Sequence, residues 1–358
     1  MLFRSDASGS SSVAIGMGSV SSGSNSMAAG CNSLASGSGA IAGPQSAATG
    51  IESVCFGHGS PAGSTNGARG NYSVAIGGGT VASGTSSLAI GRYANATGEH
   101  SSAIGHSLAS GSHSFAAGIA SNSSSYGAQG NYSFAQGSVA KAVASNSIAL
   151  HQGAHASGSG STAIGSYAHA DGGNATAIGN YADAAGDDSF CFGGNSNADG
   201  EYSFVFGHRL KATEKGKYVY GFGQFASQGD AQGGSFVLRS DTTDATAEAM
   251  TTNNATADAT NQIVAASDTC IMFSGTVVAM QNGAADQGGW EIKGLLKNDG
   301  GTTTLVNSNV QTFADGNGWA VALSADNTNN ALKVQVTGEA SHNIRWVANI
   351  QTSEVTYA

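Results

Sequence analysis

Residues 12 to about 223 repeat one pattern of polar, apolar and small positions about every 14 residues. Each repeat reads Ser, apolar, Ala, apolar, Gly, as in Ser73-Val-Ala-Ile-Gly77 and Ser87-Leu-Ala-Ile-Gly91. A weaker half-repeat follows it, such as Tyr93-Ala-Asn-Ala-Thr-Gly98. A fixed short period is typical of solenoid proteins, in which each repeat forms one coil that stacks on the next. We therefore predict an all-β solenoid whose coils each have two short strands and two glycine corners.

Strand alternation assigns the small and the large residues of each repeat to opposite sides. Only Ala, Ser or Gly fit between the two strands of so narrow a coil, so residues such as Ala75 and Ala89 are predicted to fill its interior. The larger residues then form an outward apolar stripe, which a soluble monomer rarely exposes. Packing of three chains around one axis would cover the stripe. We predict a homotrimer whose interface contains Val13, Ile15, Val74, Ile76, Leu88, Ile90, Ile104, Ile148, Leu150, Ile164, Ile178, Phe190, Phe192, Phe204, Phe206, Tyr218 and Tyr220.

The repeated phrases and their Ala-x-Ala-x-Gly half-repeats resemble the YadA-like head of trimeric autotransporter adhesins, over residues 12–223. The resemblance implies a left-handed parallel β-roll that trimerises, with the larger apolar residues facing the partner chains. At a strand spacing of about 4.8 Å, roughly fifteen coils would form a rod about 70 Å long.

Two intervals of the repeat are longer than the others, with extra residues near 60–70 and 120–130. Both end in Gly-Asn-Tyr-Ser, which places Tyr72 and Tyr132 beside the insertions. Loops on a rigid scaffold often carry recognition, so these two tyrosines are candidate receptor contacts. The simpler interpretation is a tolerated insertion, with each tyrosine covering a coil corner.

From residue 235 the repeat gives way to alternating runs such as Trp290/Ile292 and Ile344/Trp346, and Asn298-Asp-Gly-Gly301 is a hairpin signal. These runs predict an antiparallel β-sandwich or jelly roll with the tryptophans in its core. On phrases such as Phe236-Val-Leu-Arg239, residues 235–358 resemble the C-terminal domain of phage tail-fibre and minor structural proteins.

The chain is thus predicted to have four parts. They are a short N-terminal attachment peptide over residues 1–11, the β-roll over 12–208, a neck over 209–234 and the C-terminal domain over 235–358.

Composition argues against several classes of function. The 358 residues carry a net charge of −10 with no basic run, so neither nucleic acid nor an anionic membrane is an expected partner. The chain has no apolar run of about 18 residues, the length of a membrane-spanning helix, so no membrane insertion is expected. Residues 1–10 lack the apolar core of a signal peptide. Neither the four cysteines nor scattered histidines such as His113, His155 and His169 have metal-site spacing, so we expect no metal or other cofactor.

The resemblance to autotransporters does not extend to a signal peptide or a C-terminal membrane anchor. A fibre made in the host cytoplasm and released by lysis needs neither. We therefore predict a non-enzymatic structural protein of a phage virion, in its tail, neck or head fibre. A virion adaptor, tail, neck or capsid protein would hold the trimer, which would present its C-terminal domain to a host-surface receptor, a glycan, with threefold avidity.

Two alternatives stay open: a bacterial trimeric surface adhesin, and a tailspike that degrades polysaccharide. A glycosidase needs two opposed carboxyl groups. The adjacent Asp187 and Asp188 are sequence neighbours in a predicted loop, so no catalytic residue is predicted.

Overall fold

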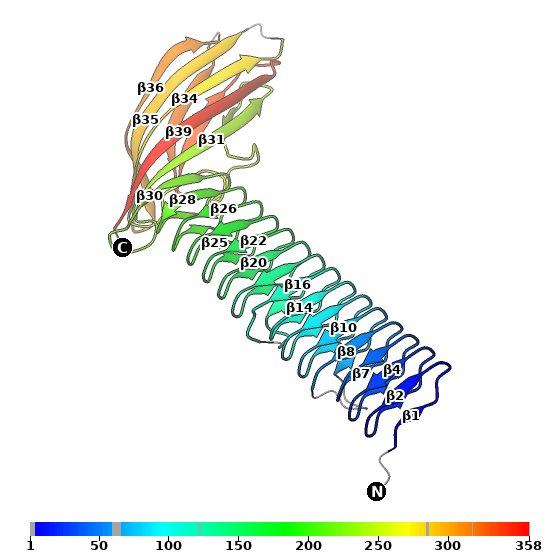
Figure 1. Ribbon diagram of the computed structural model, residues 1–358. Helices are drawn as coiled ribbons and strands as arrows, with labels where there is room; N and C mark the ends of the chain where they lie inside the picture. The colour runs from blue at the N-terminus through cyan, green and yellow to red at the C-terminus, as the bar shows by residue number, and fades with distance from the viewer. Residues whose placement is uncertain (1–3, 59–65, 122, 284–285, 317, 358) are drawn as a thin grey trace. The chain divides into compact units, whose positions relative to one another are not determined.

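The computed structural model describes residues 4–58, 66–121, 123–283, 286–316 and 318–357, and within these ranges the secondary structure is β-strand and turn without a helix. No helix that could span a membrane is therefore found among the described residues. The chain divides into two compact units, residues 1–174 and 175–358. The all-β class, the parallel solenoid and the antiparallel C-terminal part predicted from the sequence are confirmed (Figure 1).

Each coil of the first unit contributes one strand to each of two parallel sheets. Sheet A contains the two-residue strands β1 (Asp6–Ala7), β3 (Val20–Ser21), β5 (Leu34–Ala35), β7 (Ala47–Ala48), β9 (Gly67–Ala68), β11 (Val81–Ala82), β13 (Asn95–Ala96), β15 (Leu108–Ala109), β17 (Gly127–Ala128), β19 (Lys141–Ala142), β21 (His155–Ala156) and β23 (His169–Ala170). Sheet B contains β2 (Val13–Ile15), β4 (Met27–Ala29), β6 (Ile41–Ala42), β8 (Val54–Phe56), β10 (Val74–Ile76), β12 (Leu88–Ile90), β14 (Ser102–Ile104), β16 (Phe115–Ala117), β18 (Phe134–Gln136), β20 (Ile148–Leu150) and β22 (Thr162–Ile164).

The repeat sets the register of these sheets. Ala75 pairs with Ala89, one period further along the chain, and Ile76 pairs with Ile90. The interior alanines of both sheets, such as Ala75, Ala82 and Ala89, are fully buried as predicted, whereas Ala7 and Ala14 at the N-terminal end of the solenoid are exposed and half-buried. The corner glycines are required because adjacent coils are so close. A Cβ on Gly84 would collide with the carbonyl oxygen of Gly98 in the next coil.

In many repeats the opening serine closes the coil corner through its hydroxyl. The buried hydroxyl donates a hydrogen bond to the carbonyl three residues earlier, for example from Ser53 to Gly50 at 2.8 Å and from Ser101 to Gly98 at 2.7 Å. A buried hydroxyl is costly without a partner, so serine suits this position where the corner carbonyl accepts its hydrogen bond. In other repeats the buried hydroxyl has no hydrogen-bond partner among the described residues, as at Ser73, Ser87, Ser161, Ser189 and Ser203.

The second unit begins with further coils. Their strands are β24 (Thr176–Ile178), β26 (Phe190–Phe192), β28 (Phe204–His208) and β30 (Tyr218–Phe222) on the sheet B side, and β25 (Asp183–Ala184), β27 (Asn197–Ala198) and β29 (Lys211–Ala212) on the sheet A side. The predicted neck, residues 209–234, contains β29, β30 and the start of the next strand.

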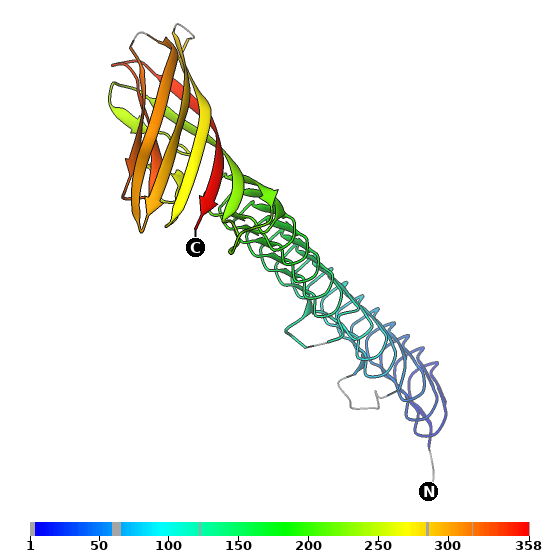
Figure 2. The same ribbon diagram turned by 90° about the vertical axis from the view of Figure 1, so that its left-hand side faces the viewer.

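Sheet B then becomes antiparallel. In the second unit β30 pairs with β31 (Ala231–Thr242), and the order continues through β39 (Ile344–Thr356), β34 (Thr269–Gln281), β35 (Gln287–Asp299) and β36 (Thr302–Asp315). Figure 2 shows these long strands, coloured green to red, lying side by side. A smaller sheet contains β32 (Ala247–Ala249), β33 (Ile263–Val264), β37 (Ala320–Asp326) and β38 (Ala331–Thr337).

The two C-terminal sheets enclose a core of large side chains. Trp346 lies at its centre, with its ring 5.4 Å from that of Trp290 and 5.7 Å from that of Trp319. All three tryptophans are buried with Phe236 and Phe273, which confirms their predicted place in a core. The C-terminal part therefore has a large-residue core that the coils lack.

Candidate functional site: the outward face of sheet B

The first and third residues of each sheet B strand point away from the coil interior. In β10 the middle residue, Ala75, is fully buried, whereas Ile76 is 41% exposed and Val74 is half-buried. The same alternation holds in β12. The structure therefore places the predicted interface residues on one side of sheet B, where the single chain leaves them exposed or half-buried.

Sequence reasoning missed part of this face. Met27, Phe56, Phe115 and Phe134 occupy the same outward positions, but their repeats depart from the common phrase. The rings of Phe115 and Phe134 stack at 5.0 Å. The register of the repeat could have identified them. For example, Phe134 pairs with the predicted interface residue Ile148.

The outward side of sheet A is less uniform. Its first strand positions are apolar in early coils, at Val20, Leu34 and Val81, and are charged or polar in later ones, at Lys141 and His155. Of the two sides, sheet B is the one that stays mainly apolar from coil to coil.

Within the second unit, the outward side of sheet B continues from the coils onto the antiparallel strands. Tyr218 pairs with Ser235 across the junction of β30 and β31. Further along the same side lie Val237, Val278 and Val347, which are exposed. A sheet face that carries apolar side chains without cover is a candidate for contact with another protein.

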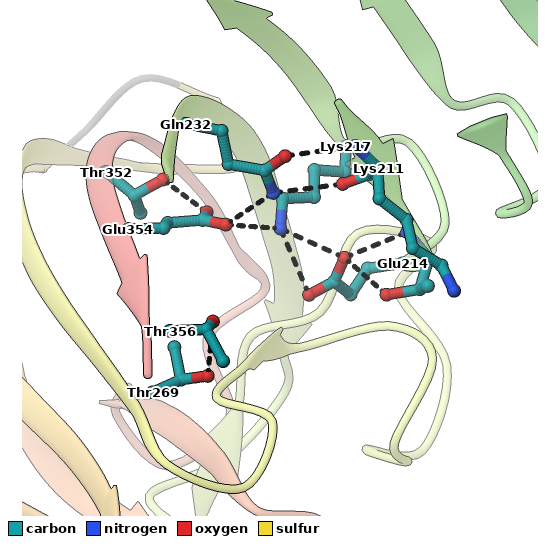
Figure 3. Close-up of polar contacts among 9 residues, drawn as sticks. Lys211, Glu214, Lys217, Gln232, Thr269, Thr352, Glu354 and Thr356 are labelled. Atoms are coloured by element: carbon teal, nitrogen blue, oxygen red, sulfur yellow. Dashed lines mark hydrogen bonds and ion pairs between the residues drawn. The ribbon is translucent and has the colours of Figure 1, made fainter. Parts of the chain in front are cut away.

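A buried ion cluster joins the last coil to β39 (Figure 3). Lys217 Nζ lies 2.9 Å from Glu354 Oε2 and 3.2 Å from Glu214 Oε2, and all three side chains are at most 6% exposed. Glu354 also accepts hydrogen bonds from Gln232 Nε2 at 2.9 Å and Thr352 Oγ1 at 2.7 Å. A Cβ on Gly234 would lie 2.7 Å from Glu354 Oε1, so glycine leaves room for the cluster.

The electrostatics of this cluster favour ionised groups. Burial opposes the charged form of Lys217, but Glu214 and Glu354 outweigh burial and raise the pKa of the ammonium. Burial likewise opposes the carboxylate of Glu354, but Lys217 and the hydrogen-bond donors hold its pKa below the ordinary value. A glycosidase acid requires a raised pKa. The arrangement therefore suits a structural tie between coil and sheet rather than proton transfer to a sugar.

Comparison with known proteins identifies the coils. A family model described as "YadA head domain repeat (2 copies)" matches residues 68–94, 82–107, 128–150, 156–182 and 184–209. The coils within these matched residues are YadA head repeats. No curated protein matches the chain.

Among the similar solved structures is that of a tailspike protein gp49 from Acinetobacter baumannii bacteriophage Fri1, described as a capsular polysaccharide depolymerase. The identity is 9% and the TM-score is 0.23. The match covers 94% of the present chain and 47% of the tailspike, so the chain spans about half the length of that protein.

The two candidate receptor tyrosines lie at regular corners of the YadA head repeats, directly before the serine. Tyr72 and Tyr132 have φ values of 60° and 57° and are 55% and 62% exposed. His113 occupies the same corner one coil before Tyr132, and their rings stack at 4.8 Å. This geometry agrees with the interpretation that tyrosine covers a corner, and a role in receptor contact stays a prediction. Part of the first insertion, residues 59–65, lies outside the described residues, as do residues 1–3 of the predicted attachment peptide.

Proposed function

We propose that this protein is a homotrimeric, non-enzymatic fibre protein of a phage virion. Its YadA head repeats would form the shaft, and its C-terminal sheets would be presented to a glycan on the host surface. A virion adaptor would hold the opposite end. The main support for the proposed trimer is the outward apolar side of sheet B, which is repeated in coil after coil.

The size of this face supports a stable rather than a transient assembly. Burying a fully exposed Val, Ile, Leu or Phe side chain gains about 1.5–3 kcal/mol, so a half-exposed one gains roughly 1 kcal/mol. The predicted interface residues together would contribute on the order of 10–20 kcal/mol per chain. Association costs about 4–15 kcal/mol, so this gain exceeds the cost over most of the two ranges and favours a stable assembly.

Threefold symmetry also supplies the binding mechanism. Three weak sites on one stiff scaffold act together on a repetitive surface, so their combined affinity exceeds that of one site by about 10²–10⁴. The fibre therefore needs no enclosed pocket and no cofactor.

A second candidate function is a bacterial trimeric surface adhesin, which the YadA head repeats favour. The two candidates share the assembly and differ in where the protein resides. Mass spectrometry of purified virions and of the outer surface of the bacterium separates them. A signal from virions alone supports the fibre, and a signal from the cell surface alone overturns the phage assignment.

The trimer itself is tested by sedimentation equilibrium in dilute buffer. The expected mass is three times the chain mass of 35.2 kDa. A folded protein that stays at the mass of one chain would overturn the proposal.

The non-enzymatic assignment has its own test. The trimer is incubated with capsular or lipopolysaccharide from candidate hosts, and both bound sugar and new reducing ends are measured. Retention of intact polysaccharide is the expected result. A steady release of reducing ends would identify a depolymerase instead.

A further inference from the structure

Two histidines and an aspartate gather on the outward side of sheet A, where the coil period aligns them. His155 in β21 pairs directly with His169 in β23, and Asp171 follows β23. The buried Ala156 and Ala170 fix the direction of the strands, so the two histidines point away from the interior. The imidazole rings lie 5.5 Å apart and nearly perpendicular.

One possible ligand atom from each of His155, His169 and Asp171 lies within 4.8 Å of the others. His155 Nδ1 is 3.7 Å from Asp171 Oδ1. We propose that these three side chains bind a divalent transition-metal ion such as Zn²⁺, with water completing the coordination.

The distances suit this proposal. Zinc binds imidazole nitrogen and carboxylate oxygen at about 2.0–2.2 Å, so two ligand atoms on one ion are at most about 4.4 Å apart. Small side-chain rotations close the remaining gap, and they are available because Asp171 and His155 are partly exposed. Two imidazoles and one carboxylate with open positions form a donor set that zinc and its neighbours in the first transition series accept.

The surroundings prepare the ligands. Ser157 Oγ donates a hydrogen bond to Asp171 Oδ1 at 2.5 Å and so orients the carboxylate, as outer-shell partners do at metal sites. Lys141 pairs with His155 from the preceding coil, and its positive charge would oppose a bound cation.

A second histidine pair on the solenoid lacks this arrangement. The ring of His113 stacks on that of Tyr132, and the ring of His100 lies tilted against the ring of His113; both centroid distances are 4.8 Å. Glu99 lies 3.4 Å from His100 Nε2. Within the described part of the chain, however, only His155, His169 and Asp171 form a group with metal-binding distances. His113 therefore serves as a matched control.

The experiment is calorimetric titration of ZnCl₂ into full-length, untagged protein that has been treated with a chelator and dialysed. One ion per chain is the expected result, and H155Q, H169Q and D171N should each lose it. H113Q should retain the wild-type stoichiometry, and K141Q should bind more tightly because it removes an opposing charge. Cobalt gives an independent readout, because visible absorption from Co²⁺ should appear in wild type and H113Q and be absent from H155Q.

A wild-type protein that takes up no ion would overturn the proposal. So would H155Q, H169Q and D171N proteins that bind as much as wild type, since the ion would then lie elsewhere. Circular dichroism of each variant establishes that the solenoid is folded. Because the site ties two coils together, Zn²⁺ should also raise the unfolding temperature of wild type and leave that of H155Q unchanged.

Discussion

The YadA head repeats and the C-terminal sheets differ in the side chains that fill their interiors. The coil interior is filled mainly by alanine, and the larger residues point outward. The C-terminal sheets instead enclose Trp346, Phe236 and other large side chains. Burial of apolar area is the main favourable term in folding, so a coil with an alanine interior gains little of it alone. We infer that the coils depend on partner chains far more than the C-terminal sheets do.

The largest expected effect comes from placing charge on the outward face of sheet B. In a trimer, I76D and I90D would put six carboxylates against apolar neighbours, and an unpaired buried charge costs several kcal/mol. We expect the double variant to sediment as single chains whose coils lose protection from hydrogen exchange. The C-terminal strands should keep their protection.

The matched control is S86D, which adds charge at the exposed corner between the same two strands. Its sedimentation should equal that of wild type. If I76D/I90D remained trimeric, the interface would lie on another side of the coil.

The converse variant is W346A, which removes the centre of the C-terminal core. The loss of the ring leaves a cavity and removes the hydrogen bond from Nε1 to Thr242 Oγ1, which measures 3.0 Å. Truncation of a buried aromatic costs about 3–5 kcal/mol. Hydrogen exchange should accelerate in β34, β35 and β39, while the trimer mass stays unchanged. Equal acceleration throughout the coils would contradict the independence of the two regions.

A third variant addresses the connection between them. K217M leaves Glu214 and Glu354 buried without their cation, and breaking a buried ion pair in this way costs about 3–5 kcal/mol. Replacing the second partner as well, in K217M/E354Q, should recover part of the loss. The control K215M removes an exposed pair with Glu201, which solvent screens, and should cost far less stability than K217M. Urea denaturation followed by tryptophan fluorescence measures these differences.

The same cluster predicts how stability depends on pH. The folded pKa of Glu354 is lowered from 4.5, so its contribution is present above pH 4.5 and is lost as the pH falls through the lower folded value. The folded pKa of Lys217 is raised from 10.5, so its contribution is present below pH 10.5 and is lost as the pH rises through the higher folded value. K217M should therefore lose less stability than wild type when the solution is acidified. A parallel loss in both proteins would place the acid sensitivity elsewhere.

A smaller effect tests the narrow coil. A89V adds two methyl groups to a side chain that is fully buried between the two strands of the coil. Overpacking of this kind costs about 1–3 kcal/mol. T85V, at an exposed position of the same coil, is the control and should be close to neutral. Thermal unfolding of each variant beside the wild-type protein measures both effects. If A89V were as stable as wild type, the coil could widen, and its narrow interior would not require alanine.

Periodic sequence predicts periodic structure well, and other features less well. The 14-residue period was sufficient to place Ala75, Ala89 and Ile76 on their correct sides, because strand alternation leaves only two directions. It also aligns His155 with His169, but a search for the short spacings of familiar metal sites passes over residues that are one coil apart. Lys217 and Glu354 are separated by 137 residues, so no local pattern brings them together.

Irregular positions were harder to interpret for a related reason. Tyr72 and Tyr132 stand next to insertions in the sequence, and this proximity made them candidates for recognition beside the simpler interpretation that they cover coil corners. In the structure they occupy the same left-handed corner as Ser86 and His113, which the period alone would have shown. The register of a solenoid therefore carries more information about a residue than its neighbours along the chain do.

The smallest expected change in stability is at these corners. Y72N and Y132N keep a residue type that tolerates positive φ, so stability should change by less than about 0.5 kcal/mol. Tyr202 has a φ of 57° at an equivalent corner away from the insertions, which makes Y202N the matched control. Binding of the trimer to whole host cells or their polysaccharide is then compared among the three variants. If Y72N or Y132N bound more weakly while Y202N bound like wild type, the insertions would turn an ordinary corner into a receptor contact. Equal binding by all three would leave tyrosine as corner cover, and recognition would then belong to the C-terminal sheets.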